Sequence, residues 1–397
     1  MNVLFFQPFG GVGHLDSWAS LTVAAVLDSG GKATVVAPQT TCKALNIHFE
    51  GPTSRSALFT IPLDTGATSP WRLFWFLASL MLSVKSLISG KLDWRASPLT
   101  VLKANQLARR SLDASIDVIF LPYLDGFNTR KGEWKLLRRL LPIPLVGIRF
   151  VGSAERRTEL HESVDAVALL DERLVDQCNK DLRAPRYVFL PDISPISTKH
   201  SDSDLYQQIR RFSSGRKIVL LIGAINSRKS PRLWCDVIDA GDPKEWAFVQ
   251  VGKVEWRSLG GNSAQRLRDT HLAHPESFLL IDEYVSDVNF HLVFELADAV
   301  FAVYDNFSES SNLIFHSAYH RKPVLVANSG LMATRVQQFG LGLLCQDTNP
   351  KAVLQQLSRM IKQGVSADGV RHYQETFNES EFKKAISQLV SIAVNKK

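Results

Sequence analysis

Cysteine is scarce in this sequence, with four among 397 residues, and no two cysteines form a C-x-x-C pair. Cys42, Cys178, Cys235 and Cys345 are widely scattered, which predicts reduced, mostly buried thiols in a cytosolic protein. The sequence also lacks a zinc-ligand spacing, a helix-turn-helix pattern and an aromatic RNA-binding consensus. Nucleic acid is therefore the least supported class of partner.

A signal peptide is not predicted either. Met1, Asn2 and Val3 lead directly into an apolar strand, without a basic leader or a cleavage site. This start predicts a cytoplasmic protein, either free or at the inner face of the membrane.

An apolar run long enough to span a membrane is also lacking. Residues 71–92 form the most apolar segment, but Arg72 and Lys85 interrupt it. About a dozen apolar or small residues lie between these two charges, fewer than the ~20 that a span needs. Three interpretations remain: a helix packed in the first domain, an interfacial helix that contacts a membrane or lipid acceptor through residues 71–95, and, least favoured, a span.

The composition is that of a soluble globular protein, with 45% hydrophobic and 21% charged residues. A chain of 397 residues is too long for one ordinary core and predicts two domains of roughly 150–200 residues each. The net charge of +7 and the pI near 9.2 favour anionic partners, such as phosphorylated donors or anionic lipid surfaces.

Short apolar runs alternate with helical patterns along the whole chain. This alternation predicts an α/β protein whose parallel sheets are buried on both faces. The expected strands of the first half are 3–6, 33–37, 117–121, 144–148, 164–170 and 187–190, and those of the second half are 217–223, 247–252, 278–282, 299–303 and 324–327.

A glycine-rich loop, residues 10–14, follows the first strand and precedes a helix. Gly11 and Gly13 permit a ligand to approach the backbone, and the start of the helix favours an anion. No acidic residue closes the second strand, so the loop is not a complete dinucleotide fingerprint. His14 either points into a site or only caps the helix.

The second half carries two further loops of this kind. Residues 223–231, GAINSRKSP, follow an apolar strand and place Arg228 beside Lys229. Residues 307–330 read as a polar loop, a helix, a tight turn at Pro323 and a buried strand. Because ligands bind at the carboxyl ends of parallel strands, we expect both loops to open at the same edge of one sheet.

These loops resemble the nucleotide-sugar site of GT-B glycosyltransferases, especially the retaining enzymes of glycosyltransferase family 4. Residues 308–316 align with the family pattern E-x-F-G-x-x-x-x-E, and residues 223–230 align with G-R-L-x-x-x-K-G. Lys229 falls on the family lysine, whereas the first glutamate position is Ser308, one residue before Glu309. The second glutamate position, which binds ribose in the family, is His316.

The resemblance implies two doubly wound Rossmann-like domains that face a central cleft. It assigns Glu309 and His14 to catalysis and Arg149 to the acceptor or a phosphate. The residues that it assigns to the donor are Gly11, Gly13, Gly223, Arg228, Lys229, Tyr284, Ser310, Ser311, Asn312 and His316. The domains expected on this basis are residues 1–192 for the acceptor, 193–215 as linker, 216–375 for the nucleotide sugar and 376–397 as a C-terminal helix.

The reaction that the resemblance implies transfers a hexose or related sugar from a UDP- or GDP-linked donor to a glycan or lipid-linked acceptor, with retention. No cofactor or metal is expected, because Lys229 and Arg228 neutralise the leaving diphosphate. The pathway implied is polysaccharide or glycolipid assembly. Two alternatives remain: a non-catalytic GT-B-like protein that binds a nucleotide or glycan, and a GT-B sugar epimerase, which needs several carboxylates where only Glu309 is placed.

Overall fold

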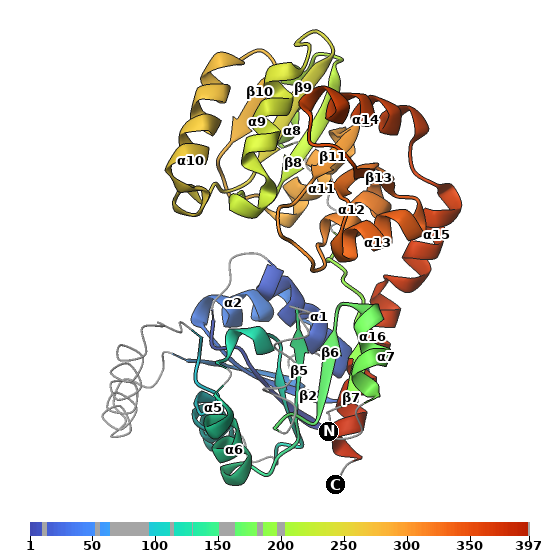
Figure 1. Ribbon diagram of the computed structural model, residues 1–397. Coiled ribbons are helices and arrows are strands. Elements are labelled where there is room, and N and C mark those ends of the chain that lie inside the picture. Colours follow the sequence, from blue (N-terminus) through green and yellow to red (C-terminus); the bar gives the residue numbers. More distant parts are fainter. Residues whose placement is uncertain are drawn as a thin grey trace. The chain divides into compact units, whose positions relative to one another are not determined.

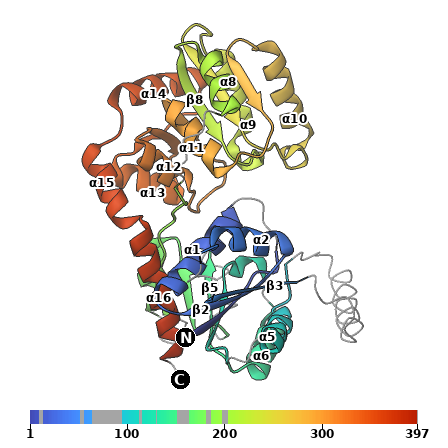
Figure 2. The same ribbon diagram turned by 180° about the vertical axis from the view of Figure 1, so that it is seen from behind.

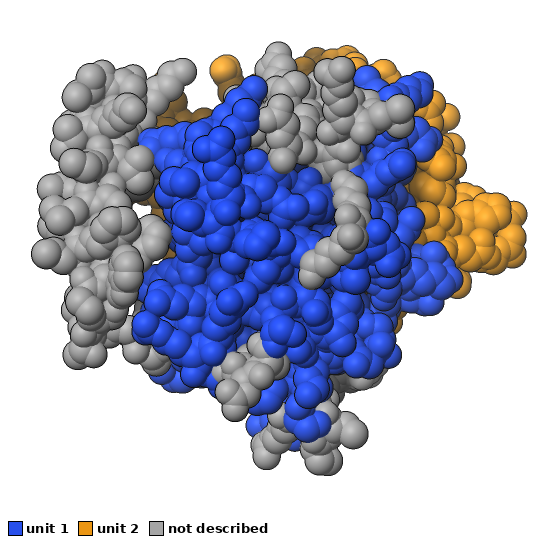
Figure 3. Space-filling view, turned by 90° about the horizontal axis from the view of Figure 1, so that it is seen from below, with its two compact units in different colours: residues 1–191, 379–397 blue, residues 192–378 orange. Residues whose placement is uncertain are grey.

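The computed structural model describes residues 1–9, 14–51, 56–63, 95–111, 115–128, 130–150, 163–180, 186–196 and 203–395. The chain divides into two compact units, coloured separately in Figure 3. The first unit comprises Met1–Pro191 together with Glu379–Lys397, and the second comprises Asp192–Asn378. The end of the chain therefore returns to the unit in which it began.

The first unit contains a seven-stranded parallel sheet in the order β3-β2-β1-β4-β5-β6-β7 (Figure 1). Its strands are β1 Asn2–Phe6, β2 Lys32–Ala37, β3 Leu58–Pro62, β4 Val118–Leu121, β5 Leu145–Arg149, β6 Ala166–Leu169 and β7 Arg186–Phe189. Its described helices are α1 His14–Asp28, α2 Gln39–His48, α5 Thr100–Ser111, the 3₁₀ helix η1 Leu124–Gly126, α6 Lys131–Leu140, α7 Glu172–Asn179 and α16 Glu379–Val394.

The second unit contains a six-stranded parallel sheet in the order β10-β9-β8-β11-β12-β13. Its strands are β8 Lys217–Ile222, β9 Trp246–Val251, β10 Phe278–Ile281, β11 Ala299–Ala302, β12 Val324–Ala327 and β13 Gly342–Cys345. Its helices are α8 Asp204–Ser213, the 3₁₀ helix η3 Ser227–Lys229, α9 Pro231–Ala240, α10 Trp256–Ala273, α11 Asp287–Leu296, α12 Leu313–His320, α13 Gly330–Phe339, α14 Pro350–Gln363 and α15 Ala367–Thr376.

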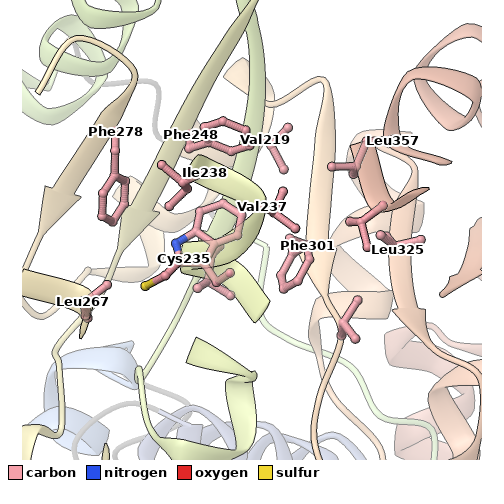
Figure 4. Packing of buried hydrophobic residues seen from close by; sticks show 14 of the residues in the cluster. Val219, Cys235, Val237, Ile238, Phe248, Leu267, Phe278, Phe301, Leu325 and Leu357 are labelled. Carbon is pink, nitrogen blue, oxygen red and sulfur yellow. The ribbon is translucent and has the colours of Figure 1, made fainter. Parts of the chain in front are cut away.

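Apolar side chains on both faces of each strand explain why helices cover both sides of the sheets. In the second unit, Trp234 of α9 is fully buried, with its ring centroid 5.6 Å from that of Phe248 and 5.0 Å from that of Phe301. Figure 4 shows Val237 and Ile238, also of α9, among these sheet side chains. This packing holds the β8–α9 connection, and therefore its loop, on a rigid base.

Helix α16 packs beside α1 in the first unit, as both Figure 1 and Figure 2 show. Phe382 lies with its ring centroid 5.3 Å from that of the buried Trp18, and Lys383 forms a 2.7 Å ion pair with Asp28. The C-terminal helix is thus part of the first unit's core.

Each sheet reverses its strand order at one point. In the first sheet β1 lies between β2 and β4, and in the second sheet β8 lies between β9 and β11. Loops at the carboxyl ends of the two strands on either side of such a switch point diverge, which leaves room for a ligand. In the second unit these are the loops after β8 and β11.

The α/β fold with two parallel, helix-flanked sheets is confirmed. The expected strands are present, and the structure adds β3 and β13, which are not among the predicted strands. All four cysteines are buried, and none of them forms a disulfide. Residues 71–92 lie outside the described part of the chain, and none of the described helices is long and apolar enough to cross a membrane.

Candidate functional site

Two glycines shape the loop that follows β8. Gly223 has φ +95°, and a Cβ there would lie 3.1 Å from Nζ of Lys229. Gly252, at the end of β9, has φ +138°, and its Cβ would lie 2.1 Å from the carbonyl oxygen of Gly223. Only glycine fits this second position, because the two backbones approach too closely for a side chain. The loop is thereby held against its neighbour at the switch point.

Lys229 is buried at the carboxyl end of β8, with 3% of its surface exposed. Its ammonium group donates a hydrogen bond to the carbonyl oxygen of Ile222 and lies 5.5 Å from the ring centroid of Tyr304. Burial, reinforced by the neighbouring Arg228, lowers the pKa of Lys229 to about 7, and Glu255 opposes this shift. Within the described residues Lys229 has no ion-pair partner, so its charge is available to an anionic ligand.

Arg228 precedes Lys229 and is exposed, and its guanidinium carbon lies 5.1 Å from the ring centroid of Phe307. The backbone N–H of Asp305 donates a 2.7 Å hydrogen bond to the carbonyl oxygen of Arg228. These contacts join the loop after β8 to the loop after β11. The predicted meeting of these loops within one unit is therefore observed.

Tyr304 lies next to Lys229, where the loops after β8 and β11 meet. Burial raises the pKa of its hydroxyl to about 12, although Arg228 and a hydrogen bond with Ser311 act in the opposite direction. The neutral ring therefore presents its face to the Lys229 ammonium as a cation–π partner rather than as a counter-ion. The site keeps its positive charge.

A series of hydrogen bonds between buried polar side chains holds the loop after β11 in place. The Ser310 hydroxyl donates to the carboxylate of Asp192 and accepts a 2.6 Å hydrogen bond from the guanidinium of Arg335, in α13. Asp192 and Arg335 are 2% and 1% exposed. Two residues further on, the Asn312 side chain donates a 3.2 Å hydrogen bond to the hydroxyl of Ser194. These groups position the loop, since Ser310 already makes both of its hydrogen bonds within the protein.

The loop after β12 packs against the loop after β11. Gly330 has φ +85°, and a Cβ there would lie 2.8 Å from the carbonyl oxygen of Phe307. The N–H of Leu331 donates a 3.1 Å hydrogen bond to the carbonyl oxygen of Ser308. The start of α13 is thus fixed directly behind the serine-rich stretch.

Three further predicted site residues are the catalytic candidate Glu309 and the donor-binding candidates Tyr284 and His316. Glu309 is partly exposed between Ser308 and Ser310 and has no hydrogen-bond or ion-pair partner among the described residues. Tyr284, on the loop after β10, is 57% exposed. His316 is 3% exposed, and its ring centroid lies 4.7 Å from that of Phe290 in α11. Its contacts are with the helices behind the loop.

Some of the site residues that were predicted in the first unit lie outside the described residues. Gly11 and Gly13 lie outside them, and His14 is the first residue of α1. Arg149 ends β5, and its guanidinium Nε lies 3.3 Å from a carboxylate oxygen of Asp125, with both side chains 6% exposed. Asp125 also accepts a 2.6 Å hydrogen bond from the N–H of Phe150. The charge of Arg149 is therefore matched inside the unit.

Sequence reasoning did not find Asp192, Arg335, Tyr304, Gly252 or Gly330. Arg335 reads as an ordinary charged residue of an amphipathic helix, and Asp192 as part of a proline-rich linker. Gly252 directly follows β9, and Gly330 comes three residues after β12, so a glycine at or near the end of a predicted strand was an available signal.

A hollow with a volume of about 690 Å³ lies between Trp246 and α14. Trp246 begins β9, so this hollow is at the amino end of the sheet, opposite to the three loops. Parallel sheets bind their ligands at the carboxyl ends, and we therefore place the candidate site at the loops.

No protein-family model and no curated protein matches this sequence. Solved structures do match it along almost its whole length. HepE from Anabaena, in a complex with UDP and glucose, is 13% identical with a TM-score of 0.65, over 98% of this chain and 99% of that chain. A glycosyltransferase from Rickettsia africae is 11% identical with a TM-score of 0.63, over 100% and 99%. Sucrose-phosphate synthase from Thermosynechococcus elongatus is 14% identical with a TM-score of 0.63, over all of both chains. These neighbours are glycosyltransferases of GT-B type, and the two parallel, helix-flanked sheets described above match their GT-B fold.

Proposed function

We propose that this protein transfers a sugar from a nucleoside diphosphate sugar to an acceptor hydroxyl. The observation that carries the proposal is the position of Lys229 and Arg228 at the switch point of the second sheet. A buried ammonium group that has no carboxylate partner among the described residues, next to an exposed guanidinium and the start of α9, suits a diphosphate. Neighbours of the same fold are complexes with UDP or UDP-glucose, which favours such a donor.

The chemistry follows from where charge develops. When the bond between the anomeric carbon and the diphosphate oxygen breaks, the electron pair leaves with the phosphate. Lys229 and Arg228 stabilise this charge, which is why we propose a metal-independent reaction without a cofactor. The acceptor oxygen forms the new bond to the anomeric carbon and gives its proton to the departing phosphate oxygen, and Glu309 contacts the sugar.

Finer features of the proposal rest on the resemblance to glycosyltransferase family 4. They are a UDP- or GDP-linked hexose, retention at the anomeric carbon and a glycan or lipid-linked acceptor. We propose that His14 and Arg149 serve the acceptor in the first unit, where Arg149, whose charge Asp125 already matches, contributes hydrogen bonds rather than net charge. We further propose a place in polysaccharide or glycoconjugate assembly, with peripheral membrane contact through residues 71–95.

A non-catalytic nucleotide-binding protein is the second candidate. It is favoured by His316, which stands at the family's second glutamate position and is buried against Phe290. A protein without that carboxylate retains the cations for a diphosphate but lacks one of the groups that the family uses on its donor.

Turnover separates the two candidates. We expect the wild-type protein, given UDP-glucose or a GDP-hexose with a mixture of glycan acceptors, to release the nucleoside diphosphate. Glu309→Gln should lower this rate about 100-fold, because a charged group that acts in the transition state is lost. Glu283→Gln, which removes a carboxylate from the loop after β10, is the matched control. Binding of nucleotide without release by the wild-type protein would instead support the non-catalytic candidate.

A further inference from the structure

Three histidines come together behind the loop after β11. His291 belongs to α11, and His316 and His320 belong to α12. One ring nitrogen from each can be chosen so that all three lie within 4.8 Å of one another. We propose that these histidines form a binding site for one divalent transition-metal ion, with Zn²⁺ as the favoured ion. The proposal does not depend on the proposed function.

The spacing along α12 suits a metal. His316 and His320 are four residues apart, so their side chains lie on the same face of the helix, one turn from each other. Their rings are nearly parallel, with an interplanar angle of 16° and centroids 6.4 Å apart. Two histidines at this spacing on one helix are a recurrent way to present two imidazoles to zinc.

His291 supplies the third group from the facing helix. Its Nδ1 lies 2.9 Å from Nε2 of His320, and its Nε2 lies 3.2 Å from the carbonyl oxygen of Pro195. A carbonyl only accepts hydrogen bonds, so Nε2 of His291 carries the hydrogen and Nδ1 of the neutral ring carries a lone pair. A backbone carbonyl that fixes the tautomer in this way is the usual outer partner of a metal-bound histidine.

The distances require only a small rearrangement. In a tetrahedral zinc site with Zn–N bonds of about 2.0–2.1 Å, the ligand nitrogens are about 3.3 Å apart. His291 and His320 must separate slightly from 2.9 Å, and His316 must approach them by rotating its ring. His320 also moves its hydrogen from Nε2 to Nδ1, so three coordinate bonds form without net release of a proton.

The surroundings favour neutral rings. Phe294 packs against both histidines of α12, with ring centroids 5.3 Å from that of His316 and 5.6 Å from that of His320. These apolar contacts favour neutral imidazole rings, which keep a lone pair for a metal ion. Three imidazoles without a carboxylate or thiolate suit zinc, copper, iron or nickel rather than magnesium or calcium. The partly exposed side of His320 leaves a fourth position for water.

A metal here would join α11, α12 and the segment at Pro195. Because α12 follows Asn312 directly, the same ion would also restrain the end of the loop that carries Ser310. We therefore expect metal binding to raise the thermal midpoint of the protein, since the ion binds the folded chain and not the dispersed histidines of the unfolded chain.

The first experiment uses the full-length protein without an affinity tag, stripped with a chelator and then titrated with Co²⁺. We expect one equivalent to bind, with the visible absorption of tetrahedral cobalt, and Zn²⁺ to displace it and raise the thermal midpoint. Absence of this absorption together with no Zn²⁺ retained against a competing chelator would overturn the proposal.

The second experiment tests whether the metal ion binds at these three histidines. His320→Gln changes the least buried of the three ligands and should weaken Zn²⁺ binding at least 100-fold, the upper range for loss of a group that merely supports a ligand. His274→Gln removes a histidine that pairs at the surface with Asp239, 3.0 Å away, and should leave Zn²⁺ binding unchanged. The opposite ranking would contradict the proposal. Circular dichroism verifies that each variant folds, and His291→Gln replaces His320→Gln if the latter does not fold.

Discussion

The two units of this protein each place one buried cation at the carboxyl end of a strand, but the two cations differ in what surrounds them. Arg149, at the end of β5, faces the buried carboxylate of Asp125. Lys229, after β8, faces a backbone carbonyl and the neutral ring of Tyr304. The first cation is compensated within the protein, whereas the second is left with charge for a ligand. A buried cation indicates an anion site only where the fold has not already supplied the anion.

We expect the largest effect from a substitution that breaks the buried ion pair of Arg149 and Asp125. Asp125→Leu leaves the Arg149 guanidinium buried without its partner, and we expect the free energy of unfolding of the first unit to fall by about 3–5 kcal/mol. Denaturant unfolding measures this change.

Two controls sharpen that comparison. The double variant Asp125→Leu, Arg149→Leu should be more stable than Asp125→Leu alone, because no buried charge is left unpaired. Glu245→Gln breaks the exposed pair with Lys217 and should cost about 0–1 kcal/mol. Equal losses for Asp125→Leu and Glu245→Gln would mean that the buried pair is not the balanced element described here.

A smaller effect should appear in the pH dependence of nucleotide binding. The pKa of Lys229 is about 7 in the folded protein, against an ordinary value of 10.5. Lys229 is therefore charged below pH 7 and becomes neutral as the pH rises through 7, so the affinity for a diphosphate should fall above pH 7, by at most about tenfold per pH unit. Calorimetry in buffers of different ionisation enthalpy should detect uptake of a proton on binding at pH 8.

The lowered pKa of Lys229 also makes the free energy of unfolding depend on pH. Between pH 7 and 10.5 the unfolded chain holds a proton on Lys229 that the folded chain does not. Without nucleotide, this residue therefore destabilises the fold most below pH 7 and least above pH 10.5. Lys229→Met should flatten the pH dependence of both binding and stability, and an unchanged binding profile in that variant would assign the titration to another group.

The smallest expected effect concerns Arg228. Its guanidinium is exposed beside Phe307, so water and salt screen its charge. Arg228→Gln should weaken nucleotide binding by about 0.5–1 kcal/mol at low salt and by less at high salt. Calorimetric titrations at two ionic strengths measure the difference, and a loss as large as that of Lys229→Met would reverse the proposed ranking of the two cations.

The sequence predicts the elements and the loops well because both depend on local patterns. The apolar runs of β8 and β11 and the polar residues that follow them are adjacent in the chain, and parallel topology brings the ends of such strands to one edge. The expected positions of Gly223, Lys229 and Ser310 at these loops needed no long-range information.

The sequence does not predict which charged side chains are paired with a polar or oppositely charged partner in the folded protein. Asp125 lies 24 residues before Arg149 in a 3₁₀ turn, and no local pattern relates the two. Asp192 precedes Ser310 by 118 residues and Arg335 follows it by 25, yet both bond to Ser310. Whether a charge in a loop is buried, paired or available depends on such contacts, and hence on the tertiary structure.

Calorimetric titration of the wild-type protein and Lys229→Met with UDP, GDP and ADP is the measurement that tests the central claim most directly. Lys217→Met, at the opposite end of β8, is the matched control. We expect one nucleotide to bind the wild-type protein and Lys217→Met with equal affinity, and Lys229→Met to bind it more than tenfold more weakly, a loss of about 1.4 kcal/mol. No binding of any nucleotide at millimolar concentration, or equal binding by Lys229→Met, would contradict the assignment of an open anion site to the second unit.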